Sequence, residues 1–266
     1  MKQIVFALMM VSGVAGAQSA PFDFTVPFPN ASKLQGSLRL NVGYADAEGA
    51  GQAAEVDLPI GSRVVVMATS NLAYQRFGTL EGAGQVEAIV DVVRFAGWHL
   101  AVDGGARRHY DGSGIAIGRL SLSQTTGTWS VAANADVAHA FSGPELETVT
   151  DVWVGSRMEP LIDRSPYVTQ YFQSLGATAK VASFVNLGAE TLVSEGGRAT
   201  TVFFGPVASF ALPYSRARLD LSGGPIIQTG GNSSLLPDYT VIGRYDMPYP
   251  ANPAGYTLRL GVSLGF

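Results

Sequence analysis

Acidic side chains stand two or four places apart in segments that are otherwise mostly apolar. Glu55 and Asp57 form one such pair, and Glu87 and Asp91 form another. Paired carboxylates can serve as general acid and general base. On a β-strand, however, residues two or four places apart point to the same face, so this spacing is equally typical of a polar wall. The sequence shows no metal-ligand spacing of His or Asp residues, and neither a metal nor a cofactor is expected.

The three histidines form no hydrolytic arrangement that we recognise. His99 has no serine two places on, and His139 precedes Ser142 in an order that is typical of no enzyme family we recognise. The third histidine belongs to the basic stretch 107–109, which is expected in an external loop where guanidinium groups could bind lipopolysaccharide phosphates. The prediction is therefore that the chain is not an enzyme. A lipid-modifying enzyme that uses His139 is the least favoured hypothesis.

The last eleven residues, 256–266, predict the kind of element that could position a polar wall. Apolar residues alternate through them with polar or small ones, and the last residue is aromatic. The apolar members are Tyr256, Leu258, Leu260, Val262, Leu264 and Phe266. This alternation predicts a β-strand with one apolar face. Its length matches the roughly 9–11 residues that a tilted strand needs to cross a bilayer core.

The segment 256–266 resembles the C-terminal strand of bacterial outer-membrane β-barrels, the porin-like superfamily. The resemblance lies in the terminal Phe266 and in the apolar residue at every second place before it. It implies that the barrel-assembly machinery recognises this strand and that it closes the barrel against the first strand. We therefore expect an all-β protein, a transmembrane up-and-down antiparallel β-barrel, and identify no subfamily.

The N-terminus has the features of a cleaved export signal. Lys2 precedes a short apolar run, and the small residues at 15–17 form a cleavage site, so Gln18 is the expected first residue of the mature chain. We expect a signal peptide at 1–17, an N-terminal periplasmic segment at 18–32 and the barrel at 33–266. The expected location is the outer membrane of a bacterium with two membranes. The chain contains no cysteine, which excludes a lipid-anchored lipoprotein and a disulfide framework.

The composition also favours a barrel. Hydrophobic residues make up 47% of the chain and charged residues 14%, yet after the signal no apolar run approaches the ~18 residues of a membrane helix. Because every backbone amide in lipid needs an internal partner, a closed barrel is what remains. The net charge is −4 and no basic patch with interleaved aromatic residues occurs, so nucleic acid is not an expected partner. The expected partners are outer-membrane lipids, the barrel-assembly machinery, and small polar solutes or ions.

Alternation and turn residues divide the chain into twelve predicted strands. They are expected at 33–44, 53–58, 63–72, 85–93, 98–105, 114–123, 128–140, 147–157, 180–189, 200–212, 216–226 and 256–266. In the sixth strand the apolar phase changes from Ile115 and Ile117 to Leu120 and Leu122. This change predicts a β-bulge near Gly118.

The segment 165–176 departs from the alternation. Its serine and proline suit a helix N-terminus, its last residue is a glycine suited to the C-terminal cap, and apolar residues recur every four places. We therefore expect a short helix here, which places the tight turns at 58–63 and 212–216 on the same, periplasmic side of the barrel. Two further strands in place of the helix, which would give fourteen, are the alternative.

The inward faces of the predicted strands carry charge of uneven sign. The expected basic wall of the lumen consists of Lys33, Arg39, Arg216, Arg218 and Arg259. The expected acidic wall consists of Glu55, Asp57, Glu87, Asp91, Asp103 and Asp136. Such segregation resembles the constriction of general porins, where opposed walls orient polar solutes. It favours a porin-like passive channel for small hydrophilic solutes or ions.

The alternative function is that of a closed structural barrel. Small barrels have interiors filled by side chains, and buried charges survive only when they are paired. In that case the lumen charges fill the interior, and the external loops mediate surface or partner interactions. The sequence leaves both hypotheses open.

Overall fold

The computed structural model describes most of the expected barrel and three residues that precede it. The described residues are 22, 25, 28, 36–45, 49–75, 80–110, 112, 114–142, 148–154, 157–163, 169–196, 199–213, 215–231, 239–242, 245–248 and 254–266. The predicted signal peptide at 1–17, Lys33 of the predicted basic wall and residues 165–168 of the predicted helix lie outside them. Within the described part of the chain, no helix is long and apolar enough to cross a membrane.

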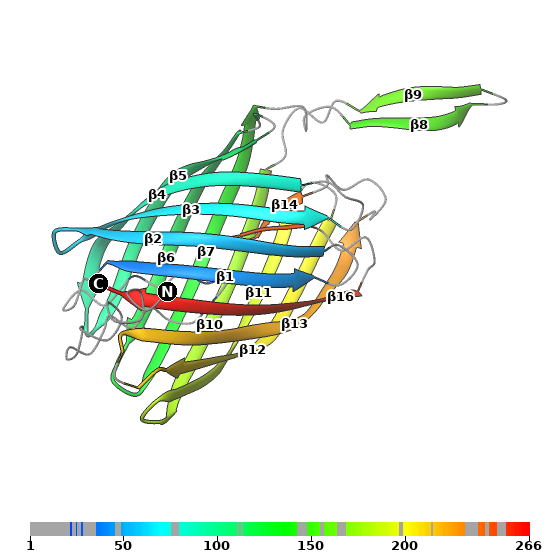
Figure 1. Cartoon of the computed structure of the whole chain (residues 1–266). Helices are drawn as coiled ribbons and strands as arrows, with labels where there is room; N and C mark the ends of the chain where they lie inside the picture. The colour runs from blue at the N-terminus through cyan, green and yellow to red at the C-terminus, as the bar shows by residue number, and fades with distance from the viewer. Residues whose placement is uncertain are drawn as a thin grey trace, which may run out of the picture.

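Among the described residues, twelve antiparallel strands form one closed barrel (Figure 1). They are β1 (Ser37–Ala45), β2 (Gly49–Ile60), β3 (Val64–Gln75), β4 (Leu80–Phe95), β5 (Trp98–His109), β6 (Gly114–Thr125), β7 (Trp129–Ser142), β10 (Thr169–Ala182), β11 (Val185–Gly196), β12 (Ala199–Ala211), β13 (Ala217–Gly231) and β16 (Ala254–Gly265). Each strand pairs with the next in this order, and β16 pairs with β1, so the sheet closes on itself. The predicted all-β, up-and-down barrel of about twelve strands is confirmed.

The last strand closes the barrel as its sequence predicts. β16 runs antiparallel to β1, with Arg39 opposite Ser263. Beyond the ladder, the amide of Phe266 donates a hydrogen bond to the carbonyl of Gly36 (2.9 Å). A Cβ placed on Gly36 would lie 2.3 Å from the ring of Phe266. Glycine at this position therefore makes room for the terminal aromatic ring beside the seam, the pairing of β1 with β16 that closes the barrel.

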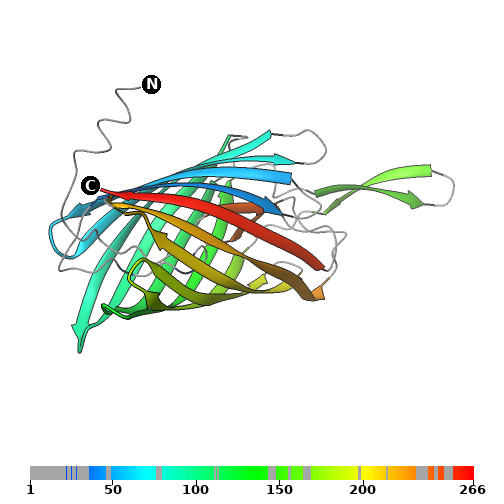
Figure 2. The ribbon, with the colours of Figure 1, turned by 60° about the horizontal axis from the view of Figure 1, so that its bottom comes forward.

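The connections at the end of the barrel where the C-terminus lies are all short, and both long ones, 143–168 and 232–253, lie at the other end (Figures 1 and 2). The connections at the end with the C-terminus are 61–63, 96–97, 126–128, 183–184 and 212–216. This end is called the turn end below, and the other is called the loop end. Both predicted tight turns, at 58–63 and 212–216, lie at the turn end, as expected. In the 96–97 connection both residues have positive φ, 47° at Ala96 and 82° at Gly97, as a two-residue type I′ hairpin requires.

The predicted eighth barrel strand, 147–157, is wrong. Its residues form β8 (Thr148–Val154), which pairs with β9 (Arg157–Asp163) in a two-stranded sheet that projects beyond the loop end (Figures 1 and 2). A second small sheet joins β14 (Tyr239–Ile242) to β15 (Tyr245–Pro248), and β15 lies against β3. Neither sheet is part of the barrel wall. The alternative of fourteen barrel strands is therefore wrong as well.

The predicted helix at 165–176 is wrong over its described part. β10 begins at Thr169 and takes the eighth place in the barrel, between β7 and β11. The misleading signal has a simple cause, because a recurrence every four residues is also a multiple of the two-residue period of a strand. Tyr171 and Leu175, four places apart, both lie on the exposed outer face, and Phe172 is buried. The predicted strand 180–189 is in fact divided between the end of β10 and β11.

Burial alternates along the barrel strands and distinguishes the inner face from the outer one. In β6 this alternation runs without a slip, because Ile115 and Ile117 are buried and Leu120 is exposed. The predicted bulge near Gly118 is wrong, and the register irregularity lies between Gly114 and Ile115. The apparent change of phase arises because two isoleucines face the lumen, a face that the sequence pattern assigns to polar residues.

The outer face of the barrel is apolar. On β1 and β16 alone, five large aliphatic side chains are 40% to 61% exposed: Leu40, Val42, Leu258, Leu260 and Val262. Contiguous apolar patches of this kind are rare on proteins that are surrounded by water. They are what a transmembrane barrel presents to lipid.

Candidate channel lumen

The predicted charged wall residues that the structure describes lie on the inner face or at its turn end. All six residues of the predicted acidic wall are buried there: Glu55 and Asp57 on β2, Glu87 and Asp91 on β4, Asp103 on β5 and Asp136 on β7. Of the predicted basic residues, Arg39 on β1 and Arg259 on β16 are buried, Arg218 on β13 is half-buried, and Arg216 lies in the turn that precedes β13. The two-residue period of the strands accounts for this placement.

The acidic residues of β4, β5 and β7 surround a guanidinium group that sequence reasoning missed. Arg119 on β6 is 4% exposed. Its Nη1 donates to Glu87 Oε2 (3.0 Å) and Asp103 Oδ2 (2.7 Å), and its Nε donates to Asp136 Oδ1 (3.0 Å). Arg119 therefore links four neighbouring strands from inside the barrel, where a buried charge needs such partners. The signal that could have identified Arg119 is its neighbour Leu120, because an apolar residue that faces outward places the preceding residue on the inner face.

Arg107 also belongs to the lumen, so the prediction of an external loop at 107–109 is wrong. These residues end β5, and Arg107 is 1% exposed on the inner face. Its Nε donates to Gln85 Oε1 (2.5 Å), and the side-chain amide of Gln85 donates in turn from Nε2 to Glu87 Oε1. Arg108 is exposed on the outer face. The prediction failed because β5 continues past residue 105, where the sequence pattern ended it.

Two of the three histidines have identifiable partners within the barrel. At the turn end, Nδ1 of His99 lies 3.0 Å from Asp91 Oδ2, and Arg94 pairs with the same carboxylate oxygen. Nδ1 of His139 on β7 lies 2.8 Å from the hydroxyl of Thr169 on β10. His99 thus extends the charged lining of the lumen, and His139 joins two adjacent barrel strands.

The basic residues on the opposite side of the lumen have acidic neighbours. Arg218 donates from Nε and Nη2 to Ser209 Oγ (3.1 and 2.7 Å), and Ser209 donates to Asp220 Oδ1 (2.5 Å). On β1, Arg39 stands opposite Glu55 of β2. In the strand order, β16 and β6 are separated by five strands on either side, so these groups lie across the lumen from Arg119. Each side of the lumen therefore carries charges of both signs.

Glu190 on β11 is a further lumen residue that the sequence prediction missed, because the strand predicted there ended at 189. It is 1% exposed, and its Oε1 accepts a hydrogen bond from the backbone amide of Thr25. Thr25, Phe22 and Phe28 all precede the barrel in sequence, and each is at least 98% buried. These three residues lie inside the barrel, and the periplasmic segment at 18–32 stays a prediction.

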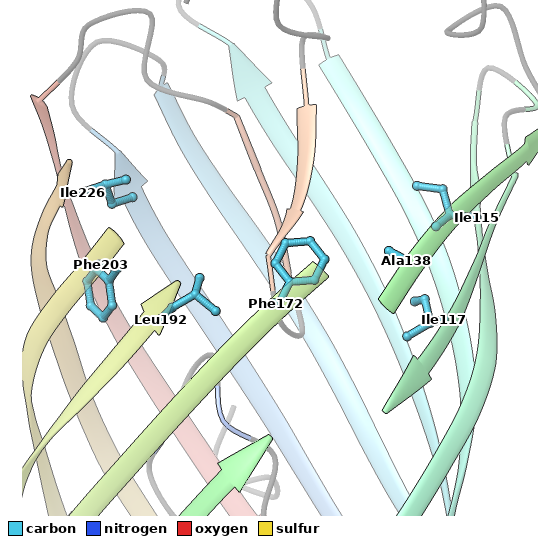
Figure 3. Close-up of a cluster of buried hydrophobic side chains, with 7 residues drawn as sticks. All are labelled: Ile115, Ile117, Ala138, Phe172, Leu192, Phe203 and Ile226. Carbon is cyan, nitrogen blue, oxygen red and sulfur yellow. The ribbon is translucent and has the colours of Figure 1, made fainter. Parts of the chain in front are cut away.

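The lumen has an apolar patch near the loop end (Figure 3). The patch consists of Ile115, Ile117, Ala138, Phe172, Leu192, Phe203 and Ile226, and all seven are buried. They come from six neighbouring strands, β6, β7 and β10 to β13, and Figure 3 shows their side chains directed into the interior. Along β6 the lining therefore changes from apolar at Ile117 to charged at Arg119, toward the turn end.

These features define the fold of the protein. The chain forms a closed antiparallel barrel with an apolar outer face and a lumen lined largely by charged and hydroxyl side chains. This is the fold of the outer-membrane β-barrel porins. Among the described residues, no group of three or more histidine and acidic side chains is arranged to hold a metal ion.

Comparison with solved structures adds particular relatives in fold. The chain is similar to a KdgM porin in complex with disordered oligogalacturonate (TM-score 0.57, 10% identity, 86% of this chain and 99% of that chain). It is similar to the NanC porin (TM-score 0.56, 13% identity, 86% and 100%) and to the β domain of the Bordetella autotransporter BrkA (TM-score 0.50, 13% identity, 87% and 99%). No protein-family model and no curated protein sequence matches the chain. At such low identity the likeness establishes the fold, and function must be argued from the lumen.

Proposed function

We propose that this protein is a porin-like channel of the outer membrane through which small hydrophilic solutes or ions diffuse passively. The observation that carries the proposal is the inner face, where charged and hydroxyl side chains recur on most barrel strands while the outer face carries large apolar side chains. A polar lumen inside an apolar shell is the arrangement of water-filled transmembrane barrels. The likeness in fold to the KdgM and NanC porins supports the proposal.

The proposed orientation follows from the connections. Outer-membrane barrels have short periplasmic turns and longer external loops, so the turn end would face the periplasm and the loop end the outside. Export through a signal peptide cleaved after Ala17 is part of the same proposal. The mass of the protein purified from outer membranes tests the cleavage, because it should correspond to a chain that begins at Gln18.

The lumen would discriminate between solutes by their charge. On the side of β4 to β7, the two buried guanidinium groups of Arg107 and Arg119 stand among the four buried carboxylates of Glu87, Asp91, Asp103 and Asp136, so acidic groups are in excess. Across the lumen, Arg39, Arg218 and Arg259 stand with Glu55, Asp57 and Asp220, so the two signs are nearly balanced there. The acidic excess on one side would produce a field across the lumen, which would orient dipolar solutes and slow apolar ones.

A specific observation favours a second candidate, the closed structural barrel. Glu55, Glu87 and Arg107 are each only 1% exposed, which indicates that wall side chains together with Phe22, Thr25 and Phe28 fill much of the interior. A lumen filled by paired charges does not conduct. In that case surface or partner interactions of the loop end would be the function.

Conductance in planar lipid bilayers separates the two candidates. The channel proposal predicts ohmic current from the purified, folded protein, with a reversal potential in a salt gradient that depends on the lumen charges. Absence of current from the mature chain and from a variant without residues 18–28 would overturn the channel and leave the closed barrel. The variant is needed because Phe22, Thr25 and Phe28 lie inside the lumen.

A further inference from the structure

We infer that the chain carries its own lumen ligand: the segment with Phe22, Thr25 and Phe28 binds to a site built into the inner wall and narrows the passage there. The consequence for transport rests on the proposed channel function, whereas the binding site itself rests on the contacts of these three residues. They are spaced three apart in sequence, and all three are buried inside the barrel.

The first part of the site is a cavity for the ring of Phe22, formed where the wall has small side chains. A Cβ on Gly176 of β10 would lie 2.7 Å from this ring, so only glycine leaves room for it. Ala132 of β7 and Val207 of β12 complete the apolar contact. Arg39 of β1 donates from Nη1 to the carbonyl of Phe22 (3.3 Å). The ring and the backbone of the same residue are thus held by separate parts of the wall.

The second part of the site holds Phe28. Its ring packs with Val65 of β3, Ile89 of β4 and Ala101 of β5, and it stacks on the ring of His99 with centroids 5.6 Å apart and planes inclined by 22°. Val65 and Ile89 face a lumen whose other lining residues are largely polar, and each is at most 3% exposed. Apolar side chains in such a place are favourable only when another apolar group covers them, and Phe28 does so.

Wall side chains also satisfy the backbone of the segment. The amide of Thr25 donates to Glu190 Oε1 on β11, and the amide of Phe28 donates to Ser123 Oγ on β6 (3.0 Å). Buried amides need such partners because water cannot reach them. Both acceptors are side chains on the inward face of the barrel wall.

The contacts place Phe22 and Phe28 on different sides of the lumen. Phe28 is held by β3 to β6, whereas Phe22 is held by β7, β10 and β12 and by Arg39 of β1. These strands belong to different sides of the barrel. Val65, Ala101 and Ser123 lie close to their turns, so Phe28 is held in the half of the barrel next to the turn end. A solute that passes this level must pass beside the segment or displace it.

Bilayer conductance of three variants tests the inference. Deletion of residues 18–28 removes the segment, and Gly176→Leu fills the cavity of Phe22; each is expected to raise the single-channel conductance several-fold above that of the mature chain. Gly104→Leu is the matched control, because a Cβ at this outward-facing position has nothing within 4 Å. A synthetic peptide with the sequence of residues 20–29 should lower the conductance of the deletion variant again, and the same peptide with Phe22→Ala and Phe28→Ala should not.

The outcomes separate this inference from the channel proposal. Equal conductance of the mature chain and both segment variants would overturn the constriction while the channel stands. If none of the proteins conducts, the channel proposal fails, and chemical labelling decides the binding site alone. The chain contains no cysteine, so Thr25→Cys supplies a single thiol. This thiol should react with a water-soluble maleimide much more slowly in the folded barrel than in urea, and faster once Gly176→Leu is added. Rapid labelling of the folded barrel without Gly176→Leu would overturn the docking.

Discussion

Replacement of Arg119 by leucine is expected to lower the free energy of unfolding of the barrel by about 3–5 kcal/mol, the range found when one partner of a buried ion pair is removed. Arg119 is bonded to three carboxylates at 2.7 to 3.0 Å. Arg119 is 4% exposed and its most accessible partner, Asp136, is 7% exposed, so water can replace little of what is lost. These contacts favour the upper part of the range.

The origin of this effect can be tested with a second substitution. Most of the loss should come from carboxylates that are left buried without a cation, rather than from the attraction that is removed. Glu87→Gln takes away one of these negative charges and keeps the shape of the side chain. The double variant Arg119→Leu with Glu87→Gln is therefore expected to be more stable than the sum of the two single effects, with a coupling energy of about 0.5–3 kcal/mol.

The measurement is reversible unfolding in urea or guanidinium chloride of the barrel in lipid or detergent, followed by the fluorescence of its three tryptophans. Arg108→Leu is the matched control, since Arg108 is exposed on the outer face of β5 and its replacement should change the stability by no more than about 0.5 kcal/mol or raise it. If Arg119→Leu changes the stability as little as Arg108→Leu does, Arg119 is not the buried centre of an ion-pair cluster.

Gly188→Val is expected to block the pairing of β10 with β11, because its Cβ would lie 1.9 Å from the carbonyl oxygen of Ala177; a heat-modifiable folded band on a gel at the wild-type level would contradict this. Arg218→Glu is expected to shift the ion selectivity toward cations, and an unchanged reversal potential in a salt gradient would place Arg218 outside the conduction path. Deletion of Phe266 removes the hydrogen bond to Gly36 and the ring beside it, so we expect slower appearance of folded barrel in a pulse-chase experiment. An unchanged rate would show that the terminal residue has no part in assembly.

The alternation of side chains made the barrel and its inner charges predictable. The resemblance of the last strand to those of outer-membrane barrels predicts that β16 closes the barrel against β1, and the two-residue period places Asp103 and Asp136 on the inner face. This pattern can be read within one strand, because each barrel strand has lipid on its outer face and polar groups on its inner face. What the pattern could not supply is the neighbour of each charge, which depends on the register between strands.

Three failures show where local pattern loses its meaning. Ile115 and Ile117 line the lumen, but the sequence pattern assigns apolar residues to the outer face. The same assignment turns Arg119, two places after Ile117, away from the lumen. The start of β10 carries a helix-like signal because a four-residue recurrence fits both a helix and a strand. The contact between Thr25 and Glu190 joins residues 165 positions apart, and nothing in the sequence around either residue indicates it.

The lumen charges that are grouped by sign along the sequence are paired with charges of the opposite sign in the folded barrel. Counted along the chain, the acids of β4 to β7 suggest a wall of a single sign. In the barrel, Arg119 lies among three of them, and across the lumen Ser209 joins Arg218 to Asp220. Such pairs within one side cancel much of the field and hold adjacent strands in register, because sliding would separate the partners. The force on a passing solute then depends on how many carboxylates each guanidinium group neutralises. Only the charge that stays unbalanced on each side of the lumen can orient the solute.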